Sequence, residues 1–259
     1  ESILDHAATI AYMNANGDQT HPQVTLSSDA KATLDFARDN HIPVRAHVLV
    51  WHSQTPNWLF TENYSTEKDA PVVSKEVMKQ RLENYTNAYF KLLSEEYPDV
   101  DFYAIDVVNE AVNPDRPDGL RAPATVATTS GDDDNDENAN NSMWMTTIGA
   151  EFIEDAFTYA RAAADQYMPN VKLAYNDYNE CDPKKTEIIY SLCKDLYDKG
   201  LLDVVGMQGH YNMSSPSTSQ FENALLKYAS IGDNIEIQIT ELDITQDDTS
   251  EEGLIKQAY

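Results

Sequence analysis

The sequence has few or none of the features that mark disulfide-rich, nucleotide-binding and membrane-spanning proteins. Two cysteines, Cys181 and Cys193, are too few for a disulfide framework. Glycine occurs only nine times, and no glycine-rich turn of the kind that cradles phosphates follows a predicted strand, which argues against nucleotide binding. No run approaches the roughly 18 apolar residues of a membrane-spanning helix. The first residues show no basic segment followed by an apolar one, so no signal peptide is visible in this chain.

Positive charge is scarce as well. Lysine and arginine total 18 against 44 aspartate and glutamate residues, which gives a formal net charge of −26 at pH 7. This balance argues against nucleic acid and anionic membrane surfaces as partners, whereas a neutral polymer is compatible with it. The six histidines form no zinc-type cluster with the cysteines, so we expect no metal and no cofactor. A hydrophobic fraction of 41% in 259 residues predicts one large folded α/β domain.

Two strand-like stretches each end in a carboxylate. Phe102 to Val108 predicts a strand that is buried on both faces, and it is followed by Asn109 and Glu110. Much later, residues 235–240 alternate between apolar and polar types and are followed by Glu241, with Asp243 two positions beyond. Two carboxylates are the minimal equipment for splitting a glycosidic bond, one as the acid and the other as the nucleophile or base.

The rest of the chain alternates strands and helices. Strands are predicted over 44–51, 102–109, 171–175, 203–207 and 235–240, and helices over 3–13, 27–40, 74–96, 148–168, 183–200, 219–230 and from 251 onward. Polar side chains follow each strand: His52, Asn109-Glu110, Asn176-Asp177, Gln208-His210 and Glu241-Asp243. All strands of a (β/α)8 barrel present their carboxyl ends on the face that holds the active site. We therefore predict a (β/α)8 TIM barrel. The alternative is an open doubly wound sheet, but this sequence lacks the glycine-rich turn that is typical of that fold.

Five stretches of this sequence, in order, resemble glycoside hydrolase family 10, the retaining endo-β-1,4-xylanases. They are Val44-Arg-Ala-His-Val-Leu-Val-Trp-His-Ser-Gln54, Asp106-Val-Val-Asn-Glu110, Tyr175-Asn-Asp-Tyr-Asn179, Gly206-Met-Gln-Gly-His210 and Ile239-Thr-Glu-Leu-Asp243. The resemblance covers most of the chain.

The resemblance implies catalytic roles for two glutamates. Glu110 is expected to be the general acid/base and Glu241 the nucleophile of a covalent glycosyl intermediate, with carboxyl groups about 5–5.5 Å apart in a retaining enzyme. Asn109 is expected to hydrogen-bond the 2-hydroxyl of the sugar that is cleaved. His210 is expected to orient Glu241, with Asp243 behind it.

The resemblance also implies substrate-binding residues. His52 and Gln208 are expected to hold hydroxyls of the same sugar, and Trp58 is favoured over Trp51 for contact with a sugar face. Tyr178 and Asn179 match positions that line the leaving-group side. Two further residues complete the predictions: Asn176 in a supporting role, and Trp144 as an anchor of the preceding loop.

The chain departs from the family pattern at its ends and in one loop. It starts after the point where the family has its first two strands and stops before the eighth, so we expect a single, partial-barrel catalytic domain over residues 1–259 with about five of eight strands. An incomplete barrel would expose strand edges and apolar faces. An acidic insertion around 115–145 has five acids within residues 131–138 and is interpreted as solvated rather than as a calcium loop.

Three functions stay open at this stage. The first is an endo-acting retaining hydrolase of xylan or xylo-oligosaccharides, and the second is a related barrel β-1,4-glucanase or cellulase. The third is a catalytically inactive carbohydrate-binding fragment. Further barrel segments or carbohydrate-binding modules of a parent protein are additional candidate partners. Because xylan is a large polymer found outside cells, secretion or cell-surface display is expected if the family resemblance holds.

Overall fold

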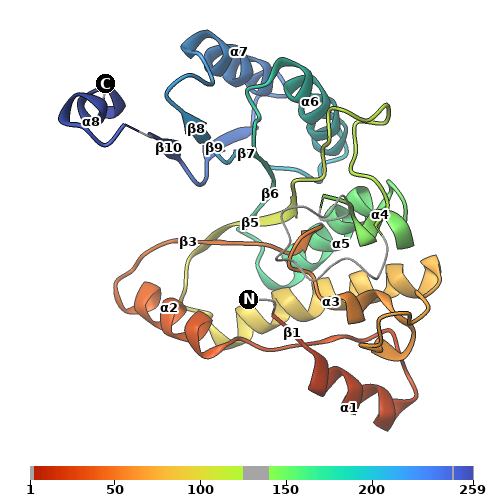
Figure 1. The fold of residues 1–259 in the computed structure, drawn as a ribbon. Coiled ribbons are helices and arrows are strands. Elements are labelled where there is room, and N and C mark those ends of the chain that lie inside the picture. Colours follow the sequence, from red (N-terminus) through yellow and green to blue (C-terminus); the bar gives the residue numbers. More distant parts are fainter. Residues whose placement is uncertain (1–2, 125–139, 247, 259) are drawn as a thin grey trace. The chain divides into compact units, whose positions relative to one another are not determined.

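The computed structural model describes residues 3–124, 140–246 and 248–258. They form two compact units, here called unit 1 (residues 1–111 and 120–173) and unit 2 (residues 112–119 and 174–259). Each unit contains parallel strands with helices packed beside them (Figure 1). The alternation of strands and helices is the α/β organisation that the sequence predicts. The centre of the predicted acidic insertion, residues 125–139, lies outside the described residues.

The helices of unit 1 begin where the sequence supplies capping side chains. Ser27 accepts a hydrogen bond from the Ala30 N–H, and Ser74 accepts one from the Val77 N–H, so each satisfies a backbone donor of a first helical turn. The helices of the unit are α1 (His6–Asn16), α2 (Ser28–Asp39), α3 (Lys75–Glu96), α4 (Met143–Thr147) and α5 (Phe152–Tyr167), and 3-10 turns span Asn57–Phe60 and Glu62–Tyr64. Helices α3 and α5 pack against each other.

The strands of unit 1 are built around β5 (Phe102–Asn109). Strands β3 (Val44–Ala46) and β4 (Val50–Trp51) both pair with β5 in parallel, with Trp51 opposite Asn109. The sequence predicts one continuous strand over 44–51, but the structure interrupts it between β3 and β4. Residues 44–51 contain no glycine or proline that would indicate such an interruption. Two short strands not predicted from the sequence, β1 (Leu4–Asp5) and β2 (Gln23–Val24), pair antiparallel.

Strand β5 also carries the charged core of unit 1. Asp106, in the middle of this strand, is 1% exposed. Arg45 of β3 forms an ion pair with it, and the Nδ1 atom of His47 lies 3.0 Å from its Oδ2 atom. A buried carboxylate needs such partners because an isolated charge is costly to bury. These contacts fasten β5, whose carboxyl end bears Asn109, to the segment that contains β3.

The main sheet of unit 2 is formed by parallel strands, with helices beside it in the part of the unit that the structure describes. Strand β7 (Val204–Met207) lies between β6 (Lys172–Asp177, of which Ala174–Asp177 belong to unit 2) and β9 (Glu236–Ile239). The helices are α6 (Pro183–Asp198), α7 (Thr218–Ala229) and α8 (Glu251–Ala258). These elements agree with the sequence prediction to within a few residues. A second parallel pair, β8 (His210–Asn212) with β10 (Asp243–Thr245), is not predicted.

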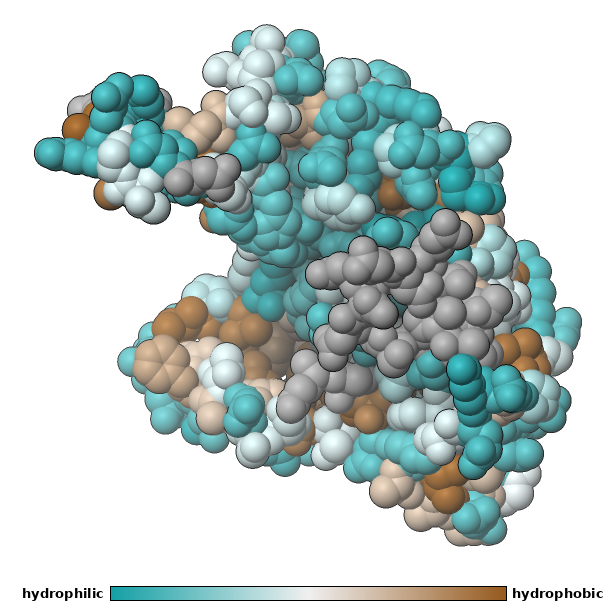
Figure 2. Space-filling model, in the orientation of Figure 1, coloured by the Kyte–Doolittle hydropathy of each residue, from teal (hydrophilic) through white to brown (hydrophobic). Residues whose placement is uncertain are grey.

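Unit 1 exposes apolar surface beside α2 and β3, where brown surface gathers in Figure 2. A cavity of about 340 Å³ opens there, with Leu34, Val44 and Tyr85 among its walls. Phe36 and Ile42, near the end of α2, are also exposed. This side of unit 1 fits the expectation that an incomplete barrel leaves apolar faces uncovered. Among the helices in the described ranges, none is long and apolar enough to cross a membrane.

Candidate active site

Glu110 follows β5 directly and receives hydrogen bonds from two side chains of unit 1. The Nδ2 atom of Asn109 donates to its Oε1 atom over 3.2 Å, and the indole N–H of Trp51 donates to its Oε2 atom over 3.1 Å. Glu110 has a backbone φ of 55°, in the left-handed region, and its side chain is 14% exposed. Because β4 and β5 pair with Trp51 opposite Asn109, the sheet register itself brings the indole to the carboxyl group.

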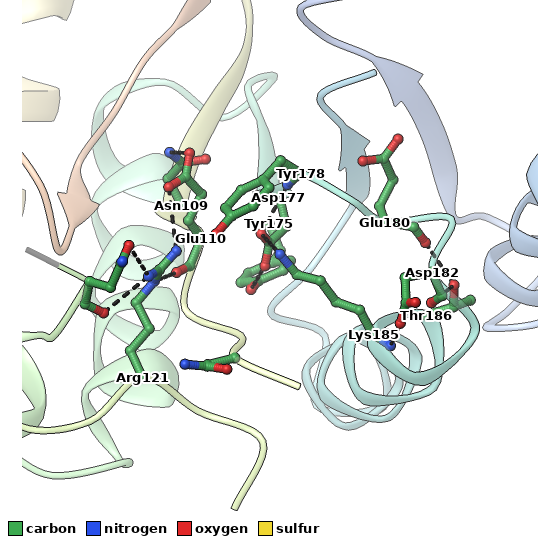
Figure 3. A network of polar contacts seen from close by, with 12 residues as sticks. Asn109, Glu110, Arg121, Tyr175, Asp177, Tyr178, Glu180, Asp182, Lys185 and Thr186 are labelled. Carbon is green, nitrogen blue, oxygen red and sulfur yellow. Dashed lines mark hydrogen bonds and ion pairs between the residues drawn. The ribbon is translucent and has the colours of Figure 1, made fainter. Parts of the chain in front are cut away.

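Arg121 is a partner of Glu110 that the sequence analysis does not single out. Its guanidinium is buried, donates from Nε to the Glu110 carbonyl oxygen, and places Nη2 3.7 Å from Oε2 (Figure 3). Arginine is rarely buried unless it is paired. Its guanidinium carries five N–H donors, so a buried arginine indicates polar partners close by. The contact joins residues 11 positions apart across a loop, which no local pattern predicts.

The three tryptophans of unit 1 have different contacts, and Trp51 donates a hydrogen bond to Glu110. Trp144 is 1% exposed, and its indole N–H donates to the Trp51 carbonyl oxygen over 3.1 Å. Its predicted anchoring of the preceding loop stays a prediction, because residues 125–139 lie outside the described ranges. Trp58 packs instead against His6 and Tyr64, with ring centroids 4.8 and 5.8 Å away. Trp51, ranked below Trp58 from the sequence, is therefore the tryptophan that touches the predicted acid.

His52 follows β4 in the chain and is partly exposed. Its ring lies edge-on to Trp51, with centroids 6.0 Å apart. The structure thus brings His52, Asn109 and Glu110 to the carboxyl ends of the paired strands β4 and β5. The sugar contacts expected of His52, Trp58 and Asn109 stay predictions.

Unit 2 holds Glu241 through two side chains, His210 and Asn176. The Nε2 atom of His210 lies 3.0 Å from Oε2 of Glu241, and Asn176 donates from Nδ2 to Oε1 over 2.9 Å. The Nδ1 atom of His210 lies 2.5 Å from Asp243, and the Thr240 hydroxyl donates to the Asn176 amide oxygen over 2.8 Å. Both oxygens of Glu241 are therefore oriented, and each orienting side chain has a partner of its own.

The environment of His210 favours its charged form. Burial lowers the pKa of the imidazole, but hydrogen bonds to Asp243 and Glu241 raise it, and the net effect is a raised pKa. The His210 side chain is 43% exposed, so solvent weakens these interactions. An imidazolium between two carboxylates offsets part of their mutual repulsion.

The backbone after β7 brings these residues together. The Gln208 N–H donates to the Asp177 carbonyl oxygen over 3.0 Å, and its own carbonyl oxygen accepts from the Glu241 N–H over 2.9 Å. Gly209 has a φ of +78°, and a Cβ atom there would lie 3.2 Å from Ile239. Glycine thus allows the turn from β7 into β8. The Gln208 side chain is buried, and its predicted contact with a sugar hydroxyl stays a prediction.

The segment after β6 carries Tyr178 and Asn179 above a buried ion pair. Lys185, in the first turn of α6, is 2% exposed and lies 2.7 Å from Asp177, which is fully buried. Its ammonium also sits 3.7 Å from the centre of the Tyr178 ring (Figure 3). Asp177 further accepts hydrogen bonds from the Tyr175 hydroxyl and the Tyr178 N–H. Lys185 therefore supports the predicted leaving-group side, and its eight-residue distance from Asp177 hides it from local sequence patterns.

Asn179 is exposed and has a φ of 50°, so the chain turns sharply after Tyr178. Glu110 belongs to unit 1 and Glu241 to unit 2, and the separation predicted for their carboxyl groups stays a prediction. Within the described ranges, no group of three or more His, Cys, Asp and Glu side chains is arranged to hold a metal ion.

Comparison with known proteins gives a family match over almost the whole chain. The model of glycosyl hydrolase family 10 matches residues 12–259. Endo-1,4-beta-xylanase Y of Acetivibrio thermocellus is 42% identical over 243 residues, which cover 90% of this chain and 21% of that relative.

Solved structures give the same match. The CBM22-1 and GH10 modules of the N-terminal endo-1,4-beta-D-xylanase 10B of Clostridium thermocellum, complexed with xylohexaose, share 40% identity and a TM-score of 0.79, covering 95% of this chain and 44% of that chain. The intracellular xylanase TsXylA of Thermoanaerobacterium saccharolyticum shares 31% identity and a TM-score of 0.73, covering 89% and 63%. This chain therefore spans about a fifth of the first relative and less than two thirds of either solved chain.

Proposed function

The chain belongs to glycosyl hydrolase family 10, and from this premise we propose that it is an endo-acting, retaining hydrolase of the internal β-1,4-xylosidic bonds of xylan. One observation carries the proposal: Glu241 is held by Asn176 on one oxygen and by His210 on the other, with Asp243 behind the imidazole. A nucleophile that must attack one carbon atom from one direction requires such orientation.

The first step of the proposed reaction forms a covalent intermediate. A carboxylate oxygen of Glu241 attacks the anomeric carbon as the bond from that carbon to the leaving oxygen breaks. The protonated Glu110 donates its proton to the leaving oxygen, so the shortened chain departs as an alcohol. The hydrogen bonds from Trp51 and Asn109 orient the Glu110 carboxyl group for this transfer.

The second step releases the sugar. Glu110, now ionised, takes a proton from a water molecule, and the water oxygen attacks the anomeric carbon and displaces Glu241. Two displacements at the same carbon retain its configuration. The nucleophile leaves as a carboxylate, and an imidazolium at His210 stabilises that negative charge.

The substrate-binding roles follow from the same proposal. His52 and Gln208 would hold hydroxyls of the sugar that is cleaved, and Asn109 would bind its 2-hydroxyl. Trp58 would contact a sugar face on the glycone side. Tyr178 and Asn179 would contact the leaving part of the chain. The ion pair beneath Tyr178 supports the last assignment, because a fixed aromatic face suits the C–H face of a pyranose.

The test is the release of reducing ends from soluble xylan and from a soluble cellulose derivative by this 259-residue chain. The proposal predicts release from xylan that is lost, by a factor of roughly 10⁴, in Glu241→Gln. A preference for the cellulosic substrate would identify a β-glucanase instead. Binding of xylan without turnover, unchanged by Glu241→Gln, would identify a carbohydrate-binding fragment.

We further propose that the protein acts outside the cell or at its surface, because xylan is too large to enter. TsXylA is described as intracellular, so the family alone does not decide the location. Detection of the protein in washed cells, culture medium and cell lysate tests this point. Its confinement to the lysate would contradict the proposal.

A further inference from the structure

Strand β8 presents two neighbouring residues to opposite sides. Successive side chains of a strand point to opposite faces, so Tyr211 lies behind the strand that carries His210 in front. The Tyr211 hydroxyl donates a hydrogen bond to Oε1 of Glu180 over 2.6 Å. Neither Tyr211 nor Glu180 is among the residues to which the resemblance to family 10 assigns a role.

Glu180 is a fixed attachment point. It is 1% exposed and lies in the segment after β6, two residues beyond Tyr178. Its carbonyl oxygen accepts hydrogen bonds of 2.7 Å from the Thr186 hydroxyl of α6 and from the Tyr228 hydroxyl of α7. Its carboxyl group points away from α6 (Figure 3). The residue is thus held from two helices while its carboxyl group faces β8.

Tyr211 is the main donor available to that carboxyl group. The Oε2 atom of Glu180 is buried without a hydrogen-bond partner among the described residues, and the Cys181 thiol lies 3.9 Å from Oε1. Burial accordingly raises the pKa of Glu180. Since an unsatisfied buried polar group is costly, the bond from Tyr211 is strongly favoured.

Few other contacts hold β8 in place. The strand has three residues, and its pairing partner β10 has three residues that are all exposed. His210 and Asp243 face each other in this pairing and are 43% and 57% exposed. A short, exposed strand pair of this kind is only marginally stable by itself. The hydrogen bond from Tyr211 to the buried Glu180 is therefore an important attachment of β8, beside the packing of its ring against Phe221.

We propose that the Tyr211–Glu180 hydrogen bond positions His210 against Glu241 and links the nucleophile to the segment that carries Tyr178 and Asn179. This inference rests on the proposed function. Tyr211 and Glu180 are positioning residues, because they act on the reaction through His210.

Three variants separate this role from a general effect on stability. Tyr211→Phe removes the hydroxyl but keeps the ring, which packs edge-on to Phe221 with centroids 6.0 Å apart. Glu180→Gln keeps an oxygen acceptor for Tyr211. Tyr228→Phe is the matched control, since it removes a buried hydroxyl that binds the Glu180 backbone rather than the carboxyl group that Tyr211 binds.

Two readouts are needed. The first is kcat and KM for an aryl xylobioside, and the second is the NMR titration of the His210 ring, assigned by its loss in His210→Asn. The ionisable groups that face His210 are Glu241 and Asp243, and those that face Tyr211 are Glu180 and Cys181.

We expect Tyr211→Phe to lower kcat roughly tenfold with little change in KM, and to move the His210 titration down toward its ordinary range. Glu180→Gln should stay within about twofold of the wild type in kcat. Tyr228→Phe should lower Tm by about 2–4 °C and leave both readouts unchanged.

The outcomes distinguish the two proposals. A wild-type kcat and an unmoved His210 titration in Tyr211→Phe would overturn the positioning role while leaving the proposed function intact. A wild-type chain without hydrolytic activity would contradict the proposed function, and the His210 titration would still test the contact. If Tyr211→Phe does not fold, Glu180→Met removes the same hydrogen bond from the other side and is read in the same way.

Discussion

Glu110 in unit 1 and Glu241 in unit 2 both follow the carboxyl end of a parallel strand, but they are held differently. Glu110 is 14% exposed and follows the long buried strand β5, and its donors come from adjacent strands and a buried arginine. Glu241 is 35% exposed and follows the four-residue strand β9. Its position depends on a chain of side chains from Asn176 and from His210 to Asp243.

The difference matches the proposed chemistry. A proton donor needs its carboxyl group aligned with one leaving oxygen, which direct donors on a rigid strand provide. A nucleophile must bind the sugar and later leave as an anion, and a histidine backed by a carboxylate stabilises that anion. The comparison predicts that unit 1 is sensitive to loss of single donors, whereas unit 2 is sensitive to loss of the supports beneath its side chains.

The largest effect is expected from the buried cation of unit 2. The buried Arg121 of unit 1 contacts Glu110, the predicted acid. The buried Lys185 of unit 2 instead pairs with Asp177, beneath Tyr178. Lys185→Met removes the cation that pairs with a buried carboxylate, which costs about 3–5 kcal/mol in the free energy of unfolding. Urea denaturation measures this loss.

The neighbouring Lys184→Met is the matched control for that variant. Lys184 is exposed, so its replacement should change the free energy of unfolding by less than about 0.5 kcal/mol. Equal stabilities of the two variants would show that the buried pair contributes nothing to unit 2.

A tenfold to hundredfold effect is expected from the indole donor of unit 1. Trp51→Phe removes the hydrogen bond to Oε2 of Glu110, and hydrogen bonds to charged groups contribute about 1.5–3 kcal/mol, or roughly 10–100-fold in rate. The loss should appear in kcat/KM for xylan, which reports the first step and whose leaving group needs a proton. An aryl xylobioside with an activated leaving group, also compared by kcat/KM, is the control, because its leaving group departs without protonation. Equal losses on both substrates would contradict a role through Glu110.

The smallest effect concerns the pH dependence of unit 2. The raised pKa of His210 contributes stability that is fully present below the ordinary histidine pKa of about 6.5 and is lost as pH rises through the folded-state pKa. The stability difference between wild type and His210→Asn should therefore shrink as pH is raised from about 6 to about 9. Solvent exposure limits the change to about 0.5 kcal/mol. Urea unfolding at several pH values measures it, and a difference that grows with pH would contradict this picture.

Much of the fold could be predicted from sequence because its signals are local. Ser27 and Ser74 mark helix starts, the buried run that ends in Asn109 marks β5, and alternation before Glu241 marks β9. The family match confirms the resemblance and, with it, the (β/α)8 barrel class, here incomplete. The single domain predicted over residues 1–259 stays a prediction.

The remainder could not be predicted because it depends on contacts between distant segments. Strands β8 and β10 have three residues each, too few for a periodic pattern, and most of these residues are polar. The contacts of Trp51 and Arg121 with Glu110 follow from strand register and loop closure. The support of Tyr178 by Lys185 likewise depends on how α6 packs below β6. The family motifs pointed to His210, Asp243 and Asn176 around Glu241. No motif pointed to Arg121, to Lys185 or to the hydrogen bond that Trp51 donates.

The most direct test of the account is covalent trapping of the nucleophile. The chain would be incubated with a 2-deoxy-2-fluoro xylobioside bearing an activated leaving group, then analysed by intact and peptide mass spectrometry. Slowed hydrolysis of the glycosyl intermediate allows it to accumulate. The account predicts one fluorosugar adduct per chain on the peptide that contains Glu241, and none in Glu241→Gln. An adduct on another carboxylate, or turnover with inverted configuration and no adduct, would contradict the central claim.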